Sequence, residues 1–222
     1  MTTGEEHWIF VEFGMVTELD SLELMSYQDF EQLMNGPYAD YYSGRWAYYK
    51  EVVEIIKNEK VTNSVELGPG YMPIVKNGDL ILNPLDDLFG KPDDRHNYVH
   101  IFDATIKHWP IADKAYDLFI GLQVWEHLDS KQTRAFREVM RIAGKAVLSF
   151  PYTWEGGIVE KPSHRAHRDV DMELIRDWTL GIEPKLSIEI KRTGDEFSKG
   201  PRMICFWDFS TSHTENEFNG QV

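Results

Sequence analysis

The segment that decides the fold is Val61-Thr-Asn-Ser-Val-Glu-Leu-Gly-Pro-Gly-Tyr-Met-Pro73, in which a segment with β-branched residues runs into two glycines separated by one proline. Residues 61–67 carry β-branched and apolar side chains, which predicts a strand. The glycines predict a tight turn directly after it. Pro73 suits the first turn of a helix, so a short helix is predicted from Pro73 to Asn77-Gly78. The glycine turn is either a ligand cradle or a simple bend.

Apolar segments recur along the chain and are separated by loops or helical patterns. Further strands are predicted over residues 79–83, 97–102, 116–123, 145–150, 186–191 and 203–209. Helices are predicted at the end of residues 38–57, from about 130 to 142, and over 171–180. Strands that alternate with crossovers are typical of a parallel sheet covered on both faces. We therefore expect a doubly wound, mostly parallel, seven-stranded α/β sheet with an antiparallel edge strand and a helical N-terminal extension.

The chain length fits one domain. Its 222 residues are enough for a single well-buried α/β domain with some additional terminal structure. We expect a helical N-terminal extension or lid over residues 1–60, a ligand-binding domain over 61–209 and a flexible tail over 210–222.

Composition argues against several classes of function. The formal net charge of −14 repels a phosphate backbone, which argues against nucleic-acid binding. No segment approaches the roughly 18 uninterrupted apolar residues of a membrane span, and the acidic opening Met-Thr-Thr-Gly-Glu-Glu predicts a cytoplasmic protein. The single cysteine, Cys205, lies in an apolar run and predicts a buried thiol, not a cysteine zinc site. Small molecules are therefore the favoured ligands.

Polar or glycine-rich features follow four of the predicted strands, where ligands bind to open α/β sheets. The features are Glu66 to Gly70, Asn83, Asp103-Ala104 and Gln123 to His127. The glycine turn lacks the Gly-Lys-Ser/Thr of a P-loop, and Pro73 stands where a dinucleotide fingerprint needs a third small residue. Both absences argue against a phosphate site and favour a cofactor that carries a nucleoside without phosphate.

An ordered set of motifs spans about Ser64 to Pro151. It consists of Val65-Glu-Leu-Gly-Pro-Gly70, Phe102-Asp-Ala104, Trp109-Pro110, Tyr116-Asp-Leu-Phe-Ile120, Val124-Trp-Glu-His-Leu128 and Arg137-Glu-Val-Met-Arg-Ile142. In order and spacing this set resembles the class I S-adenosylmethionine-dependent methyltransferases of small-molecule type. The resemblance implies a Rossmann-like sheet, S-adenosylmethionine as cofactor, and a sugar-like or anionic small-molecule acceptor methylated at oxygen or nitrogen. A noncatalytic adenosyl-ligand-binding protein of the same fold and a protein methyltransferase are the alternatives.

The same resemblance implies roles for the residues of the glycine turn. Gly68 and Gly70 let the main chain pass close under the methionine part of the cofactor, while nearby backbone N–H groups meet its carboxylate. Glu66 accepts a hydrogen bond from the cofactor's amino group. The alternative for Glu66 is a carboxylate bonded to amides of its own turn.

The next two strand ends would hold the ribose and the adenine. Asn83 stands where the family usually has an acid that binds the ribose hydroxyls, so Asp86 or Asp87 is an alternative ligand. Asp103 resembles the acid that accepts from the adenine amine, and Ala104 would offer its N–H to the ring. A simple Asp-capped turn is the other interpretation.

The fourth strand end and the loop after the fifth strand are the predicted catalytic side. Gln123 would contact the cofactor, and His127 is a candidate general base. His164 and His167, in the basic run 161–171, are further candidate bases. The same run offers cations for an anionic acceptor, namely Lys161, Arg165 and Arg168. A metal bound by His164, His167 and Asp171 is the weaker alternative, and we expect no metal.

Two further segments carry charged or aromatic residues without a motif. Residues 38–46 contain three tyrosines, Arg45 and Trp46, which either form a lid over the cofactor or pack on the sheet. Residues 199–202 are basic and are interpreted as the surface of a turn.

Overall fold

A computed structural model of the chain describes residues 22–84, 98–154, 169–191 and 200–211. Several residues named above therefore lie outside the described part of the chain. They are Asp86, Asp87, Lys161, His164, Arg165, His167, Arg168 and Lys199, together with most of the predicted tail.

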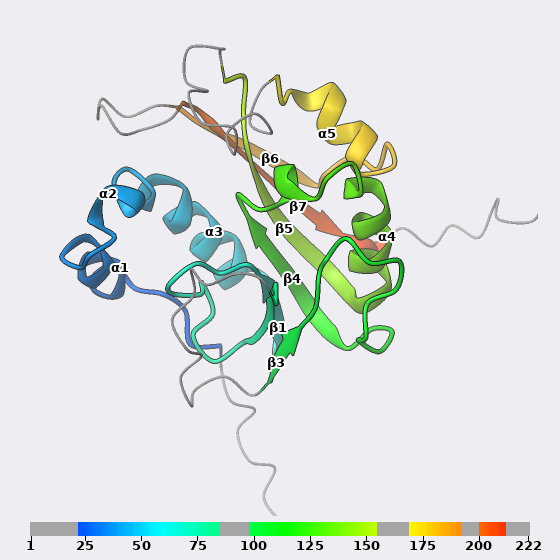
Figure 1. Cartoon of the computed structure of the whole chain (residues 1–222), viewed down its shortest axis with the longest axis horizontal. Helices are drawn as coiled ribbons and strands as arrows, with labels where there is room; N and C mark the ends of the chain where they lie inside the picture. Colours follow the sequence, from blue (N-terminus) through cyan, green and yellow to red (C-terminus); the bar gives the residue numbers. More distant parts are fainter. Residues whose placement is uncertain (1–21, 85–97, 155–168, 192–199, 212–222) are drawn as a thin grey trace, which may run out of the picture.

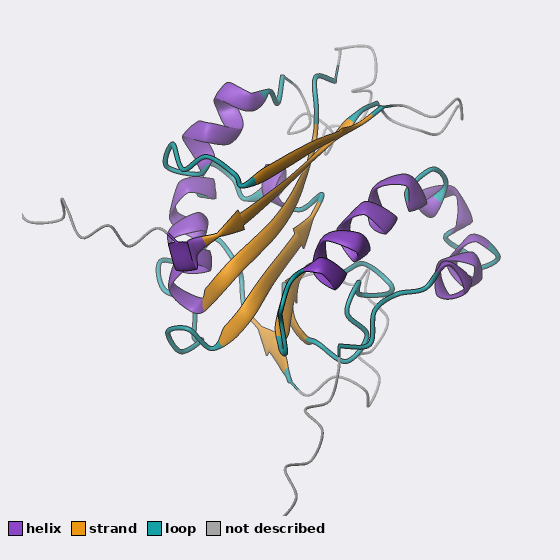
Figure 2. Ribbon diagram, turned by 180° about the vertical axis from the view of Figure 1, so that it is seen from behind, coloured by secondary structure: helices purple, strands orange, loops and turns teal. Residues whose placement is uncertain are grey.

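Seven strands of the described chain form one sheet in the order β3-β2-β1-β4-β5-β7-β6 (Figures 1 and 2). The strands are β1 (Ser64–Leu67), β2 (Asp79–Leu82), β3 (Val99–Ile101), β4 (Tyr116–Leu122), β5 (Ala143–Pro151), β6 (Leu186–Ile190) and β7 (Arg202–Asp208). The first five strands pair in parallel, and β7 pairs antiparallel with both β5 and β6. The mostly parallel seven-stranded sheet with an antiparallel pair at its edge is confirmed.

Helices cover both faces of this sheet, as expected for a doubly wound fold (Figures 1 and 2). They are α1 (Tyr27–Met34), α2 (Ala39–Tyr42), α3 (Trp46–Asn58), α4 (Gln132–Ile142) and α5 (Met172–Trp178), with short 3-10 helices η1 (Trp125–His127) and η4 (Phe209–Thr211). Successive residues of a strand point to opposite faces. In β4, Phe119 packs under α4 and α5, whereas Leu118 and Ile120 pack under α1 to α3.

The short helix predicted from Pro73 is wrong, because residues 73–78 form a bridge and turns instead. Val75 makes an antiparallel bridge with Leu24. Beside it, Met25 N–H donates to the Ile74 carbonyl at 2.8 Å, and Lys76 N–H donates to the Glu23 carbonyl at 2.7 Å. The segment is too short to offset the cost of helix nucleation. Its backbone groups bond instead to the chain that precedes α1.

The N-terminal helices take the place of a crossover helix on that face of the sheet. Apolar residues of α3 are buried there against β4 and β7, including Val52, Val53 and Ile56. The helical N-terminal extension is therefore part of the domain core. No helix in the described ranges has the length and apolarity needed to cross a bilayer. Cys205 is fully buried in β7, as predicted, and burial raises the pKa of its thiol to about 12.

Candidate functional site

The glycine turn lies at the carboxyl end of β1, where the strand order reverses between β1 and β4. Gly68 and Gly70 both have left-handed backbone angles, with φ of 59° and 71°. A Cβ added to Gly68 would lie 3.2 Å from Val124 Cγ2, and one added to Gly70 would lie 3.0 Å from the Tyr42 hydroxyl. Conformation and close approach thus both require glycine here. The turn stands at the switch point where open α/β sheets bind ligands.

Glu66 holds this turn together. Its Oε2 accepts a hydrogen bond from Ile74 N–H at 2.8 Å, and the residue is only 4% exposed. Burial raises the pKa of Glu66 to about 8, while hydrogen bonds from the N–H groups of Ile74 and Val75 act in the opposite direction. The Glu66 side chain thus bonds to amides of its own loop, which is the alternative to a bond with the cofactor's amino group.

Tyrosines of the N-terminal helices reach the glycine turn. The Tyr42 hydroxyl accepts from Tyr71 N–H at 2.8 Å. The ring of Tyr38 stacks on that of Tyr71, with ring centroids 3.5 Å apart. Trp46 instead packs against Phe30 in the core, with ring centroids 5.2 Å apart. The aromatic residues of this segment thus divide between the glycine turn and the packing of α3 on α1.

The ends of β2 and β3 carry the predicted ribose and adenine residues. Asn83 is exposed directly after β2. Asp103 is exposed after β3, and its Oδ1 accepts from Thr105 N–H at 2.8 Å, which is an Asp-capped turn. The Ala104 carbonyl accepts from Trp109 Nε1 at 3.1 Å. Within the described chain, Asp103 Oδ2 and the N–H groups of Gly70 and Ala104 have no hydrogen-bond partner.

Gln123 ties the end of β4 to β5. It has a left-handed φ of 55°, which is uncommon for a residue other than glycine. Its backbone N–H donates to the Ser149 carbonyl at 3.1 Å, and its Nε2 donates to Ser149 Oγ at 3.2 Å. Strained backbone conformations are frequent at ligand sites. The next residue, Val124, lies beside Gly68 of the glycine turn, so Gln123 is close to the predicted cofactor site.

His127 ends η1, just beyond the end of β4. Its side chain is 43% exposed, and Nε2 lies 3.9 Å from Oε1 of Glu126, whose side chain is 1% exposed. Burial raises the pKa of Glu126 to about 7, while the positive charges of Arg202 and Arg45 act in the opposite direction. Glu126 is not among the residues predicted from the sequence. The one sequence feature that could have indicated a buried carboxyl is its position directly after the apolar Trp125, which is itself buried.

The interpretation of residues 199–202 as a turn surface is wrong for Arg202. This residue begins β7, pairs with Pro151 of β5 and is only 9% exposed. Its guanidinium carbon lies 4.3 Å from the ring centroid of Trp154, and Nη1 donates to the Gly200 carbonyl at 2.8 Å. The antiparallel strand pairing draws Arg202 inward, and a stretch of Lys, Gly, Pro and Arg does not reveal this pairing.

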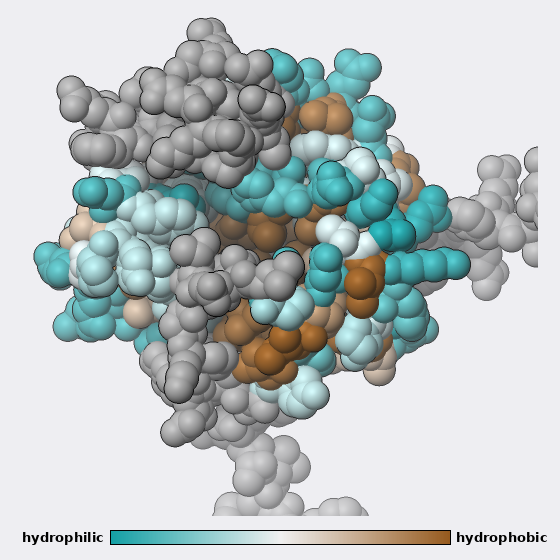
Figure 3. Space-filling model, viewed as in Figure 1, coloured by the Kyte–Doolittle hydropathy of each residue, from teal (hydrophilic) through white to brown (hydrophobic). Residues whose placement is uncertain are grey.

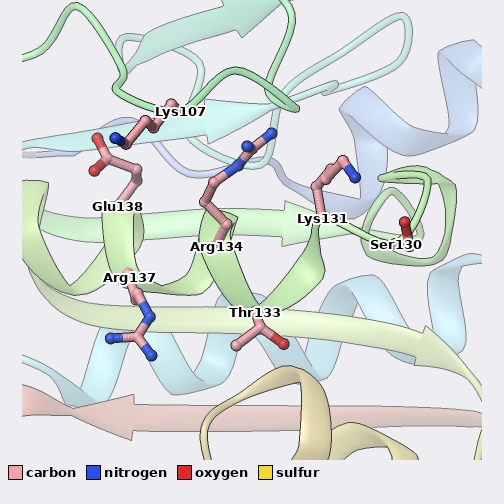
Figure 4. Close-up of a pocket in the computed structure, with 7 residues that line it drawn as sticks. All are labelled: Lys107, Ser130, Lys131, Thr133, Arg134, Arg137 and Glu138. Carbon is pink, nitrogen blue, oxygen red and sulfur yellow. The ribbon is translucent and has the colours of Figure 1, made fainter.

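Hydrophobic and hydrophilic residues are unevenly distributed on the face shown in Figure 3. Hydrophobic residues gather in the middle of this face, and hydrophilic residues flank them. A shallow cavity of about 520 Å³ also lies along α4. Its lining is mostly basic and consists of Lys107, Ser130, Lys131, Thr133, Arg134, Arg137 and Glu138 (Figure 4). Arg134 and Arg137 point to opposite sides of α4, so these cations do not converge on one ligand position (Figure 4).

Several solved structures share this fold. A methyltransferase from Thermotoga maritima, described as a possible histamine N-methyltransferase, has a TM-score of 0.53 at 14% identity, over 82% of this chain and 98% of that one. A candidate methyltransferase in complex with the Haloferax volcanii Trm112 activator has a TM-score of 0.54 at 12% identity, over 80% and 96%. The CurJ carbon methyltransferase has a TM-score of 0.50 at 13% identity, over 82% and 58%.

No protein-family model matches this sequence, and no curated protein matches it with significance. The structural likeness shows that the chain has the class I S-adenosylmethionine-dependent methyltransferase fold.

Proposed function

We propose that the protein is a cytoplasmic methyltransferase that uses S-adenosylmethionine and methylates a small molecule, sugar-like or anionic, at oxygen or nitrogen. The observation that carries the proposal is the glycine turn. Its two left-handed glycines stand at the β1/β4 switch point of a sheet with the methyltransferase fold. This is the place at which such sheets bind a nucleoside cofactor.

The residues at the four strand ends fit this cofactor. Gly70 and Ala104 each present a backbone N–H that donates to no described residue. Asp103 presents a carboxylate oxygen, Oδ2, that accepts from no described residue. In the proposal Gly70 meets the methionine carboxylate, Asp103 and Ala104 hold the adenine, and Asn83 holds the ribose. Gly68 and Gln123 shape the wall between them, and Glu66 acts by holding the turn.

Bound S-adenosylmethionine supplies an electrophilic methyl group on a sulfonium sulfur. The protein's part in methyl transfer is to align the acceptor and to exclude water. A hydroxyl acceptor also has to lose a proton, and His127 is the described candidate to accept it because its imidazole is part-exposed beside the end of β4. His164 and His167 remain proposed bases outside the described residues.

Release of S-adenosylhomocysteine across a panel of hydroxyl, amine and acidic metabolites tests this function. On the best hydroxyl acceptor, His127→Ala is expected to lower kcat about a hundredfold, with the Kd for S-adenosylhomocysteine unchanged. His108→Ala, which alters an exposed histidine before Trp109, is the matched control. An unchanged kcat for His127→Ala would remove His127 from the mechanism and leave His164→Ala and His167→Ala to be measured. Binding without turnover of any acceptor would favour a noncatalytic protein.

A further inference from the structure

Two arginines from opposite ends of the chain converge on one side of the sheet. Arg45 is the N-cap of α3, and Arg202 is the first residue of β7. Because residues two apart in a strand share a face, Arg202 lies on the same face as Ile204. Ile204 packs in the cluster covered by α1 to α3. Both positive charges act on the Glu126 carboxyl, and Arg45 also acts on Arg202.

Aromatic rings and the main chain fix both guanidinium groups in place. The guanidinium carbon of Arg45 lies 3.8 Å from the ring centroid of Tyr41, Nε donates to the Tyr41 carbonyl at 2.6 Å, and Nη1 donates to the Tyr48 hydroxyl at 2.8 Å. Arg202 is held in the same manner over Trp154. Gly200 allows this packing, because an added Cβ would lie 2.8 Å from the Trp154 ring. The two cations are thus preorganised.

Hydrogen-bonding capacity is left over on both arginines. Nε of Arg202 is buried and has no hydrogen-bond partner among the described residues. Within the described ranges, Nη2 of Arg202 and Nη2 of Arg45 also donate to no protein group. A buried guanidinium with some N–H groups left unbonded is costly. The Glu126 carboxyl can carry at most one negative charge against the two positive charges. The pair therefore has both the charge and the free N–H groups to bind an anion.

The position of Arg202 in the sheet separates this arginine from the cofactor's methionine carboxylate. In the sheet order, β4 and β5 lie between β1 and β7. Three strand spacings place Arg202 roughly 14 Å from the glycine turn. We propose that Arg45 and Arg202 bind a carboxylate or phosphate group of the methyl acceptor. This inference rests on the proposed function and assigns the acceptor's anion to these two residues.

Calorimetric titration of inorganic phosphate into the full chain tests the inference, with and without saturating S-adenosylhomocysteine. Phosphate is expected to bind the wild-type protein under both conditions. Its affinity should fall at least about tenfold in Arg202→Met and in Arg45→Met. Arg137→Met removes a positive charge from the exposed side of α4 and is expected to leave the affinity unchanged. Equal phosphate binding by the wild type and both site variants, or none by the wild type, would overturn the proposal.

Competition between phosphate and S-adenosylhomocysteine shows whether the arginines bind an anionic group of the acceptor or the carboxylate of the cofactor. If phosphate weakens S-adenosylhomocysteine binding to the wild-type protein, the arginines hold the cofactor's carboxylate, and the acceptor assignment is overturned. If Arg202→Met does not fold, Arg202→Lys replaces it, and weaker phosphate binding is expected because an ammonium lacks the planar fork. Failure of S-adenosylhomocysteine to bind would count against the proposed function. Phosphate binding alone would still test the arginine pair.

Discussion

Gly68→Ala and Gly70→Ala are expected to abolish saturable binding of S-adenosylhomocysteine, a loss of more than about a hundredfold in affinity, or about 2.7 kcal/mol. Each variant places a Cβ in a left-handed backbone conformation, which costs about 1–2 kcal/mol. The new methyl group would also lie 3.2 Å from Val124 at position 68, and 3.0 Å from the Tyr42 hydroxyl at position 70. The turn must shift to relieve these contacts, and its N–H groups then leave the positions proposed for ligand binding.

Gly181→Ala is the matched control for both variants. Gly181 has a φ of 72°, close to that of Gly70, but no atom lies within 4 Å of its added Cβ. This variant therefore carries the same backbone strain without displacing a neighbour. Urea unfolding should show a loss of stability from backbone strain in all three variants, larger at positions 68 and 70 where a neighbour is displaced, and calorimetry should show lost binding only at positions 68 and 70. Normal binding by Gly68→Ala and Gly70→Ala would mean that the turn is a bend and not a cradle.

Glu66→Gln is expected to change how stability depends on pH. Because the pKa of Glu66 is raised to about 8 in the folded state, its stabilising contribution is fully present below its ordinary pKa near 4.5. That contribution is lost as the pH rises toward 8. The loss at pH 8 is roughly 4 kcal/mol, from 1.36 kcal/mol per pKa unit. An amide at position 66 carries no charge, so the free energy of unfolding should decline less with pH in the variant than in the wild type.

Urea unfolding of both proteins at intervals from pH 5 to 8 measures this difference. Other groups titrate in the same window, among them Glu126 with a pKa raised to about 7, but they are common to both proteins and cancel in the difference. Glu31→Gln, at an exposed position of α1, is the control and should leave the slope unchanged. If the free energy of unfolding depends on pH in the same way in the wild type and in Glu66→Gln, then Glu66 is not a buried carboxyl that holds the glycine turn.

The strands and their order along the chain could be predicted from the sequence because the residues that mark a strand lie within the strand itself. Apolar runs such as Tyr116–Leu122 are buried on both faces, and β-branched or aromatic side chains mark them. The glycine turn was equally plain, since left-handed residues at the end of a strand favour glycine. Apolar residues of α3 recur at three- and four-residue spacing, which likewise predicted a helix with one buried side.

The parts that sequence could not predict depend on contacts between distant segments. Pro73 suggested a helix, but pairing of Val75 with Leu24 decided the conformation of that segment. Arg202 resembled a turn residue, yet pairing with Pro151 and stacking on Trp154 place it in the interior. The hydrogen bond that Glu66 accepts from Ile74 N–H likewise joins two segments of the loop, and residue types alone do not reveal it.

Calorimetric titration of S-adenosylhomocysteine and S-adenosylmethionine into the wild-type protein tests the central claim most directly. The glycine turn at the β1/β4 switch point, with its unused N–H group at Gly70, predicts saturable binding of both compounds at one site per chain. Adenosine should bind more weakly than either, because it lacks the methionine carboxylate that this turn would meet. Absence of binding by both compounds, in a protein that unfolds cooperatively, would contradict the account.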